Sequence, residues 1–341
     1  MEIKSQAIVY YTHPVHPEAL DLLKRFCILR NHEGERAPTP REITREARGS
    51  HALCWFLPDI IDETILNACP TLRILAGFPK GYDNIDVAAA TRKGIWVTIG
   101  PDLMVEPTAD LAWGLLLSVA RGIIPADTFV KSDKFTRWHP SQFLGHSIWR
   151  KTLGVIGMGR LGQAIAKRAK GFEMSVLYFD PRKATEGIED HLNLSFVSLD
   201  DLLRRSDFVC LASPLMDGTY HQISRKELAL MKPSAFLINP ARGSEVDEEA
   251  VSVALENGTL AGYAADVFEM EDGQFPKRPA QVTAGLINHP EQTVLTPHIG
   301  TAVKEIRIEM ARYQALNILQ ALRGERPIGA INDVPKLPPL L

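Results

Sequence analysis

Short apolar runs alternate with segments of helical period along most of the chain. In residues 7–100 the runs that favour strands are AIVYY, ALCWF, LRILAG and IWVTIG. From residue 151 onward the corresponding runs are LGVIG, SVLYF, DFVCLA, AFLIN, AGYAAD and TVLT. Strands that alternate with helices form parallel sheets with crossover helices. The sequence therefore predicts an α/β protein with two parallel sheets, the second of Rossmann type.

Two helical segments define the expected domain organisation. Residues 108–121 are apolar on most faces, which predicts a buried helix that crosses from the first domain into the second. A last long helix is expected from about Thr301 to Gly324. The residues that recur on one face of it are Val303, Ile306, Met310 and Tyr313. Because this helix follows the second sheet, we expect a discontinuous domain, 1–103 plus 298–341, with residues 104–297 inserted into it.

Residues 122–150 show no clear period and predict an irregular arm. The arm contains Trp138 and Trp149, and exposed aromatic side chains are enriched at subunit interfaces. We therefore expect this arm to take part in dimerisation.

Composition narrows the class of protein. The net charge of -3 and the pI near 6.4 argue against a nucleic-acid or membrane-surface partner. The four cysteines lie far apart without a C-x-x-C pair, which predicts neither a disulfide framework nor a zinc site, so no metal is expected. The N-terminus lacks a signal-type apolar core, and the stretch DLAWGLLLSVA looks too short to span a bilayer. These features predict a cytoplasmic protein.

A glycine fingerprint indicates a dinucleotide site. Gly157, Gly159 and Gly162 form G-x-G-x-x-G between an expected strand and helix, where they allow a tight turn and close approach of a pyrophosphate. The pattern alone is weak, but Asp180 ends the next expected strand, where a carboxylate binds the adenosine ribose hydroxyls. We therefore predict NAD in preference to NADP. Arg182 leaves some tolerance of NADP open.

Three polar residues follow the ends of later strands. Arg242, in NPARGSEVD, can bind an oxyanion through two hydrogen bonds. Glu271 and His298 suit an acid–base pair, in which the carboxylate orients the imidazole for proton exchange. The chain has nine other histidines, and Glu269 could serve in place of Glu271. Asp266 suits a partner of the cofactor carboxamide better than a base.

Taken together, the chain resembles the D-isomer-specific 2-hydroxyacid dehydrogenase family along nearly its whole length. The stretches that carry the resemblance are GYDNID, GMGRLG, NPARGS, AADVFE and TPHIG. The resemblance implies a homodimer with an NAD domain inserted into a flavodoxin-like substrate domain. It also implies that Arg242 binds the substrate anion, that Glu271 polarises His298, and that His298 is the acid–base group. We expect the cofactor to contact Thr108, Gly157, Gly159, Arg160, Leu161, Gly162, Asp180, Ala212, Pro214, Pro240, Asp266 and His298.

Within this family the chain is most similar to the phosphite (phosphonate) dehydrogenases. The supporting features are Lys80 before the glycine of GYDN and the stretches YAADVFEMED, TPHIGTAVKEIRIEM and RPIGAIN. Against the likeness, Thr301 replaces a serine, Leu144 a tyrosine and Leu57 a methionine. The residues expected to bind the substrate are Lys80, Trp138, Arg242, Thr301 and Arg307. A second cation beside Arg242 would suit a small dianion.

The sequence thus favours NAD-dependent oxidation of phosphite to phosphate, with hydride transfer to NAD. The first alternative is a D-2-hydroxyacid dehydrogenase that reduces glyoxylate, hydroxypyruvate or another 2-oxoacid. A less favoured alternative is an NAD-sensing binding protein without catalytic activity, since the acid–base trio is intact.

Overall fold

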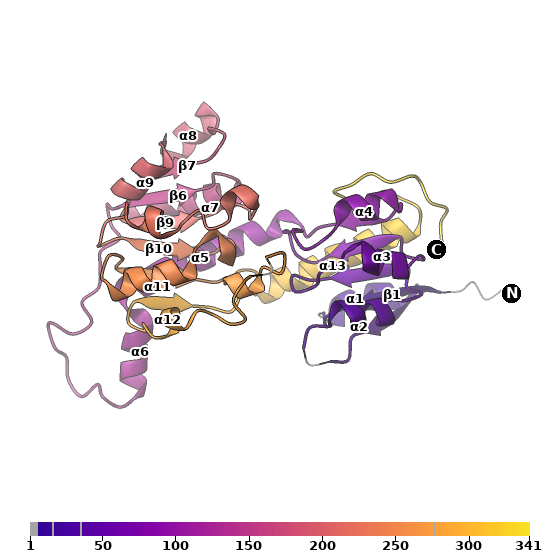
Figure 1. Ribbon diagram of the computed structural model, residues 1–341, viewed down its shortest axis with the longest axis horizontal. Helices are drawn as coiled ribbons and strands as arrows, with labels where there is room; N and C mark the ends of the chain where they lie inside the picture. The colour runs from indigo at the N-terminus through magenta and orange to yellow at the C-terminus, as the bar shows by residue number, and fades with distance from the viewer. Residues whose placement is uncertain (1–5, 16, 35, 276) are drawn as a thin grey trace. The chain divides into compact units, whose positions relative to one another are not determined.

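The computed structural model describes residues 6–15, 17–34, 36–275 and 277–341 of the 341-residue chain. The chain divides into two compact units, each drawn with its elements in Figure 1. Unit 1 comprises Met1–Met104 and Ala302–Leu341, and unit 2 comprises Val105–Thr301. Unit 1 is therefore built from two separate stretches of sequence, with unit 2 inserted between them.

Unit 1 contains a five-stranded parallel sheet with the strand order β2-β1-β3-β4-β5. This is the flavodoxin-like order, in which ligands bind beyond the carboxyl ends of the strands. Its elements are β1 (Ala7–Tyr11), α1 (Pro17–Lys24), β2 (Cys27–Asn31), α2 (Pro40–Glu46), β3 (Ala52–Trp55), α3 (Glu63–Ala68), β4 (Ile74–Gly77), α4 (Val87–Arg92), β5 (Trp96–Thr98), the 3-10 turn η1 (Asp102–Met104) and α13 (Lys304–Leu322).

Strand β2 is missing from the strands that the sequence predicts. It pairs with β1 at the edge of the sheet, and Cys27 is its one fully buried residue. An edge strand that buries so little carries no alternation of apolar and polar residues. The four strands expected in this part of the chain are confirmed as β1, β3, β4 and β5.

The second stretch of unit 1 is tied to the sheet by side-chain hydrogen bonds. From α13, Gln314 Nε2 donates to the carbonyl oxygen of Ala76 in β4 at 2.8 Å. Beyond the helix, Asn332 Oδ1 accepts from the backbone N–H of Val97 in β5 at 2.8 Å. The C-terminal residues are therefore attached to the sheet that the N-terminal residues form.

Helix α13 begins later than the sequence predicts. It starts at Lys304 rather than near Thr301. Val303, which the sequence places on the buried face, precedes the helix and is 40 % exposed, whereas Met310 is buried.

Unit 2 contains a seven-stranded parallel sheet with the order β12-β11-β10-β9-β6-β7-β8. The strands run outward in both directions from β6, so the topological switch point of this Rossmann-type sheet lies between β6 and β9. The helices and strands of the unit are α5 (Val105–Arg121), α6 (Ile123–Lys131), β6 (Thr152–Ile156), α7 (Arg160–Ala169), β7 (Ser175–Phe179), α8 (Glu186–Leu192), β8 (Leu194–Phe196), α9 (Leu199–Arg205), β9 (Phe208–Leu211), α10 (Arg225–Leu228), β10 (Phe236–Asn239), α11 (Glu248–Glu256), β11 (Gly262–Ala265), α12 (Ala284–Ile287) and β12 (Thr293–Leu295). The 3-10 turns are η2 (Lys170–Phe172), η3 (Asp217–Thr219), η4 (Gly243–Glu245) and η5 (Glu269–Glu271).

The six strands expected in this part are confirmed, and the seventh, β8, is an edge strand that the sequence misses. Of its three residues only Leu194 is buried. Two helices of this unit begin at serine caps: Ser198 accepts from the N–H of Asp201 before α9, and Ser224 with Glu227 forms a capping box before α10.

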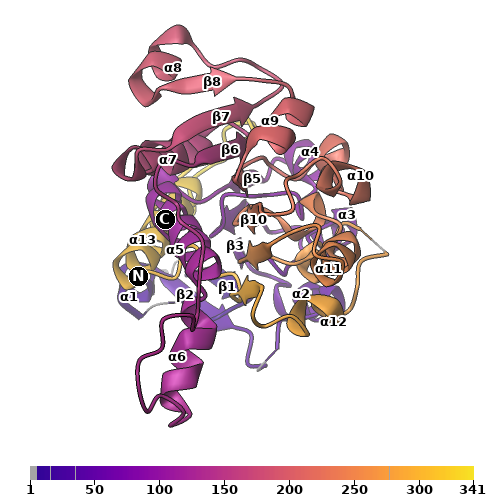
Figure 2. The ribbon, with the colours of Figure 1, turned by 90° about the vertical axis from the view of Figure 1, so that its left-hand side faces the viewer.

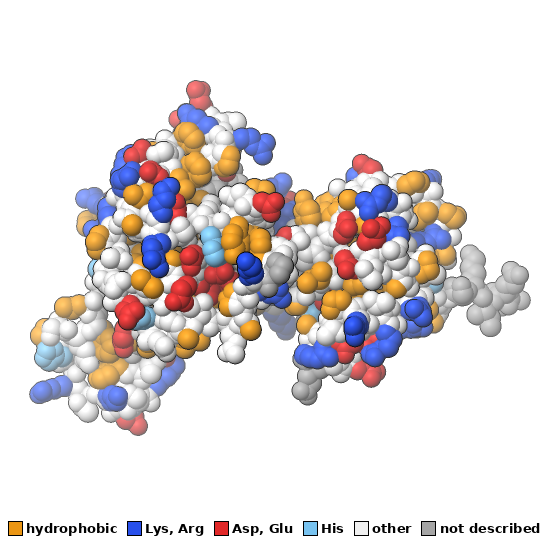
Figure 3. Space-filling model, viewed as in Figure 1, with side chains coloured by type: hydrophobic (Ala, Val, Ile, Leu, Met, Phe, Trp, Pro, Cys, Tyr) orange, Lys and Arg blue, Asp and Glu red, His pale blue; other side chains and the backbone are white. Residues whose placement is uncertain are grey.

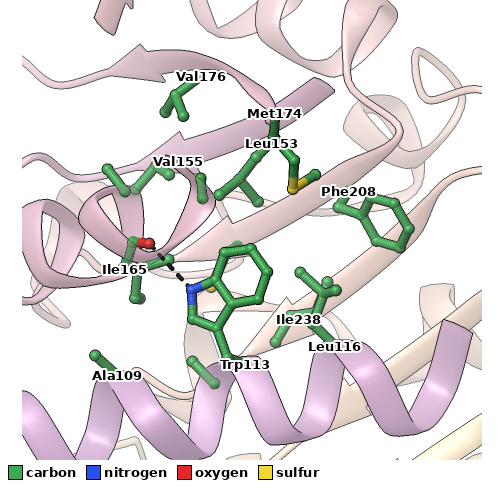
Figure 4. Close-up of a cluster of buried hydrophobic side chains, with 14 of the residues drawn as sticks. Ala109, Trp113, Leu116, Leu153, Val155, Ile165, Met174, Val176, Phe208 and Ile238 are labelled. Atoms are coloured by element: carbon green, nitrogen blue, oxygen red, sulfur yellow. Dashed lines mark hydrogen bonds between the residues drawn. The ribbon is translucent and has the colours of Figure 1, made fainter. Parts of the chain in front are cut away.

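Helix α5 packs into the core of unit 2 (Figure 4). The Trp113 side chain is 5 % exposed, its Nε1–H donates to the carbonyl oxygen of Ile165 at 3.0 Å, and its ring stacks on Phe172. A buried indole whose N–H has a partner stabilises the core without an unsatisfied donor. Helix α5 is thereby fixed against α7 and the sheet.

The stretch DLAWGLLLSVA, which looks too short in the sequence to span a bilayer, is part of a longer apolar helix. Together with η1 it forms a helical segment, Asp102–Arg121, which is the one in the described part of the chain that is long and apolar enough to cross a membrane. That test uses length and composition alone, and half of the segment is buried inside the protein. A core helix passes the same test.

The expected irregular arm, 122–150, begins with a helix, α6. This helix buries none of its residues and contains Pro125 in its first turn, so no buried face marks it in the sequence. Residues 132–150 follow without helix or strand, and Figure 2 shows α6 and this segment extending from the body of unit 2. Hydrophobic side chains lie on the surface of this projection (Figure 3). The exposed ones are Ile123, Ile124, Val130, Phe135, Trp138, Phe143, Leu144 and Trp149.

Candidate active site

Three neighbouring strands of unit 2 end at the same level of the sheet. Asn239 of β10 pairs with Ala265 of β11, which pairs with Leu295 of β12. The polar residues predicted for catalysis follow these strands directly. They are Arg242 after β10, Glu271 in η5 after β11, and His298 after β12. Their position at the carboxyl edge of a parallel sheet is where such folds bind ligands.

His298 and Glu271 form a hydrogen-bonded pair. The imidazole Nδ1 lies 2.6 Å from Glu271 Oε2, and both side chains are 28 % exposed. An ionised carboxylate can only accept, so Nδ1 carries the proton in this bond and Nε2 is left to exchange a proton with a reacting group. Of the two glutamates that the sequence leaves open, the structure therefore pairs Glu271 with His298.

The loop that carries His298 is held by Asp266. His298 has a φ of 54°, a left-handed conformation that costs a residue other than glycine about 1–3 kcal/mol. Asp266 is 1 % exposed, and its carboxylate accepts from Thr296 Oγ1 at 2.6 Å and from the N–H groups of Ile299 and Gly300 at 2.8 and 2.7 Å. Its burial raises the pKa of this carboxyl. The expected contact of Asp266 with a cofactor carboxamide stays a prediction, but its hydrogen bonds already give it a second role, since they fix the backbone on both sides of His298.

Close backbone contact joins the turn after Arg242 to the turn that carries Glu271. A Cβ on Gly243 would lie 1.9 Å from the carbonyl carbon of Phe268 and 2.2 Å from the nitrogen of Glu269, so only glycine fits there. The Asn239 side chain shapes the same turn, because its Nδ2 donates to the Arg242 carbonyl at 2.8 Å. The sequence therefore brings Arg242 and the Glu271–His298 pair to one edge through adjoining loops.

The glycine fingerprint forms a cradle that fits a dinucleotide. Gly157 has a φ of 93°, and a Cβ on Gly162 would lie 2.0 Å from the Gly157 carbonyl oxygen. A Cβ on Gly159, the N-cap of α7, would meet nothing within 4 Å, which leaves space at the start of the helix. A helix N-terminus with open backbone above it suits a pyrophosphate.

Asp180 lies beyond β7, beside the fingerprint. Its Oδ2 accepts from the N–H of Met158 and its Oδ1 from the N–H of Arg182, both at 2.9 Å. A carboxylate fixed at this strand end suits ribose hydroxyls and repels a 2′-phosphate.

The other residues expected to contact the cofactor lie on the same unit. Thr108 is on α5, and a Cβ on Gly300 would lie 3.2 Å from its Oγ1. Arg160 and Leu161 open α7, Ala212 and Pro214 follow β9, and buried Pro240 follows β10. Their contacts with a cofactor stay predictions.

The remaining residues predicted to bind substrate fall in different parts of the chain. In unit 1, Lys80 Nζ bonds to Asp102 at 2.8 Å and is about half exposed, and the Arg307 guanidinium lies 5.5 Å from the centre of the Phe78 ring. In unit 2, Thr301 is half-buried, whereas Trp138 is 77 % exposed on the arm. The described side-chain hydrogen bonds of Glu271 and His298 do not include Trp138.

Comparison with known proteins identifies the family. Residues 113–300 match the family described as D-isomer specific 2-hydroxyacid dehydrogenase, NAD binding domain. The chain belongs to the D-isomer-specific 2-hydroxyacid dehydrogenase family. The glyoxylate reductase of Thermococcus gammatolerans is 42% identical over 333 residues, 95% of each chain, and that of Pyrococcus horikoshii is 44% identical over 304 residues, 88% of each. The structure of an NADPH-dependent glyoxylate/hydroxypyruvate reductase from Sinorhizobium meliloti, in complex with NADP and malonate, has a TM-score of 0.83 and 28% identity, and the match covers 96% of this chain and 97% of that one.

Membership of this family establishes the general type of reaction, although not the substrate. The chain is an NAD-dependent oxidoreductase, and the predicted α/β fold with two parallel sheets is confirmed. The sequence favours the phosphite dehydrogenases within the D-isomer-specific 2-hydroxyacid dehydrogenases, whereas the relatives above are glyoxylate reductases. No group of three or more metal-binding side chains occurs among the residues that the structure describes.

One buried carboxyl near the site escapes sequence analysis. Glu245, in the turn after Arg242, is 0 % exposed, and its Oε2 accepts from Ser213 Oγ and from Gln222 Nε2, the latter at 2.5 Å. Its Oε1 is buried without a hydrogen-bond partner. Burial raises the pKa of Glu245 to about 8, and the Ser213 bond lowers it only in part. In the sequence the residue looks like any polar loop position, so no signal could have revealed it.

This raised pKa predicts a pH-dependent stability. The folded state holds the Glu245 proton more tightly than the unfolded chain, so the stability that this carboxyl contributes is fully present below pH 4.5, its ordinary pKa, and is lost as pH rises towards about 8. Glu245→Gln removes this titration. Between the unfolded-state pKa and the folded-state pKa, each pH unit changes the free energy of unfolding by up to about 1.4 kcal/mol. We expect the loss of unfolding free energy between about pH 5 and about pH 8 to be smaller in the variant by a few kcal/mol. Urea unfolding at both values measures it. Glu256→Gln, an exposed position on α11, is the control, and an identical pH slope in Glu245→Gln and wild type would contradict the account.

Proposed function

We propose that the protein reduces a small 2-oxoacid with NADH, reversibly, and that glyoxylate is the first candidate substrate. The observation that carries the proposal is the 2.6 Å bond between His298 Nδ1 and Glu271 Oε2 at the carboxyl edge of the NAD-binding sheet. The glyoxylate reductases among the relatives support the choice of substrate. A hydride acceptor such as a carbonyl needs a proton donor nearby, and this pair supplies one.

Each member of the trio has a separate part in the proposed reaction. Arg242 binds the substrate carboxylate through two N–H groups and so orients the carbonyl. When bound, NADH supplies the hydride that reduces the carbonyl carbon. The His298 Nε2–H donates its proton to the carbonyl oxygen, which becomes the hydroxyl of the product. Glu271 holds the imidazole and stabilises its charged form before the transfer. In the oxidative direction His298 takes the same proton back.

The stereochemistry of the product tests this proposal. The purified protein is incubated with NADH and hydroxypyruvate, and the glycerate formed is resolved by chiral chromatography. The proposal predicts D-glycerate in amounts equal to the NADH consumed. L-glycerate, or NADH consumption without glycerate, would contradict it.

A second candidate, oxidation of phosphite, is favoured by the cations of unit 1. Lys80 lies two residues beyond Phe78, and the Arg307 guanidinium lies over the Phe78 ring. The segment after β4 thus offers one cation over the Phe78 ring and a second two residues further along the chain, and two cations suit a small dianion better than a monoanionic hydroxyacid. In this reaction phosphite and water give phosphate, a hydride passes from phosphorus to NAD, and His298 takes the proton of the attacking water.

The Lys80→Ala variant tests the second candidate. Loss of a charge-assisted hydrogen bond is expected to raise the KM for phosphite about 10- to 100-fold while NAD affinity stays unchanged. Initial rates with NAD and phosphite measure it, and Lys24→Ala, an exposed lysine of α1, is the control. Unchanged phosphite kinetics would make Lys80 a surface residue that bonds to Asp102.

The exposed arm supports a further proposal about assembly. Its eight exposed apolar side chains include Trp138 at 77 % and Leu144 at 76 % exposure. Apolar surface of this kind is typical of a protein interface. We therefore propose that the chain forms a homodimer through α6 and residues 132–150.

A further inference from the structure

The turn η5 carries two glutamates, and each is paired with a different histidine. Glu271 bonds to His298, as described above, at 2.6 Å. Glu269, at the other end of the turn, has its Oε2 2.9 Å from Nε2 of His221, which follows η3. The catalytic pair and the second pair therefore share one short turn.

Glu269 is fixed more firmly than Glu271. Its side chain is 10 % exposed, against 28 % for the Glu271 side chain. Its Oε1 accepts from the N–H of Glu248 at 3.0 Å, and its own N–H donates to Glu248 Oε1 at 2.7 Å. Glu248 is 0 % exposed and opens α11. The bond to His221 is thus one of three that attach the start of η5 to its surroundings.

His221 also contacts the turn that follows Arg242. Its backbone N–H donates to the Ser244 carbonyl at 2.8 Å, and its φ is 47°. Its ring stacks on Tyr220 with centroids 4.0 Å apart, and Tyr220 in turn lies against Phe275. A left-handed conformation in a residue other than glycine persists only where the surroundings fix it, and such sites cluster at active sites.

We propose that His221 is a positioning residue, whose bond to Glu269 fixes η5 and thereby directs Glu271 at His298. The inference rests on the proposed function, because turnover is its readout. The charged and titratable groups around the His221–Glu269 pair are Glu248 on α11, Asp272 after η5, and Tyr220 beside His221. Asp247 is a fourth, because its charge helps to raise the pKa of Tyr220. Of these, Glu248 is bonded to Glu269 directly, and Asp272 Oδ2 accepts from the N–H of Ser244.

A matched pair of amide substitutions separates positioning from folding. In His221→Gln the amide nitrogen reaches about as far as Nε2 and can donate to Glu269. In His221→Asn the side chain is too short for this bond, but asparagine tolerates the left-handed backbone well, so the fold is retained. Glu269→Gln, which removes the carboxylate, is a second test that does not change residue 221. Thermal unfolding and NADH fluorescence are measured for every variant.

The kinetic readout is the pH profile of kcat for reduction of the proposed 2-oxoacid. In His221→Asn we expect kcat to fall about 10- to 100-fold, because a small displacement of a catalytic group is costly, with NADH binding unchanged. The basic limb of the profile should move to lower pH, since a misplaced Glu271 stabilises the protonated imidazole less. His221→Gln should restore both, and Glu269→Gln should reproduce the loss.

The outcomes distinguish this inference from the function on which it rests. Absence of 2-oxoacid turnover in the wild-type protein would overturn the proposed function. Turnover in the wild type with an unchanged kcat and pH limb in folded His221→Asn would overturn the positioning role alone. A loss of thermal stability without a shift of the limb would do the same, since it would make the His221–Glu269 bond purely structural.

Discussion

Replacing His298 with asparagine is expected to lower kcat about 10²- to 10⁴-fold while NADH still binds. The physical reason is the loss of the group that exchanges a proton with the substrate oxygen. Asparagine suits the position because it tolerates the φ of 54° that His298 adopts, so the loop held by Asp266 is retained. Steady-state kinetics with NADH and glyoxylate, together with NADH fluorescence, measure the two effects separately.

The chain offers a matched control for this substitution. His191 is exposed in the last turn of α8, and His191→Asn is expected to leave both kcat and NADH binding unchanged. If His298→Asn kept most of its turnover, proton transfer would have to come from another group, and the assignment of the His298–Glu271 pair would be wrong.

The second large effect is expected for Gly243→Ala. The added Cβ would lie 1.9 Å from the Phe268 carbonyl carbon and 2.2 Å from the Glu269 nitrogen, and neither backbone atom can move aside without displacing η5. Overpacking of this kind costs about 1–3 kcal/mol of unfolding free energy. A displacement of about 1 Å between Arg242 and the Glu271 turn would also lower kcat about 10²-fold. Urea unfolding and kinetics measure the two consequences.

Gly187→Ala is the matched control for that change. Gly187 lies in α8, and an added Cβ there meets nothing within 4 Å. Alanine at this helical position is expected to stabilise the fold by up to about 1 kcal/mol with kcat unchanged. Equal stability and activity of the two alanine variants would contradict the close contact on which the site geometry depends.

Much of the fold could be predicted because strands of a buried parallel sheet appear in the sequence as short runs of apolar residues. The elements that escape prediction share a physical cause, which is low burial. Strands β2 and β8 lie at sheet edges and bury little, and α6 buries none of its residues. A periodic pattern of apolar positions arises where one face of an element is buried in a core. An element that buries little of its surface therefore has no such pattern in its sequence.

The common edge of Arg242, Glu271 and His298 was predictable, because residues just beyond successive parallel strands meet there. The choice of Glu271 and His298 among the other glutamates and histidines rested mainly on the family resemblance. What the sequence could not decide is the pairing between them. Glu269 and Glu271 stand two residues apart, and only the shape of η5 directs one to His221 and the other to His298. The buried carboxyl of Glu245 likewise depends on a contact with Ser213, 32 residues away. Such pairings arise from tertiary structure and have no local signature.

Both candidate reactions can be compared in one preparation of the purified protein. The absorbance of NADH is followed with NADH plus glyoxylate and, separately, with NAD plus phosphite, in the wild type and in His298→Asn. We expect glyoxylate-dependent consumption of NADH in the wild type and its loss in the His298→Asn variant. Phosphite-dependent formation of NADH, with no turnover of glyoxylate or hydroxypyruvate, would contradict it and establish the second candidate instead.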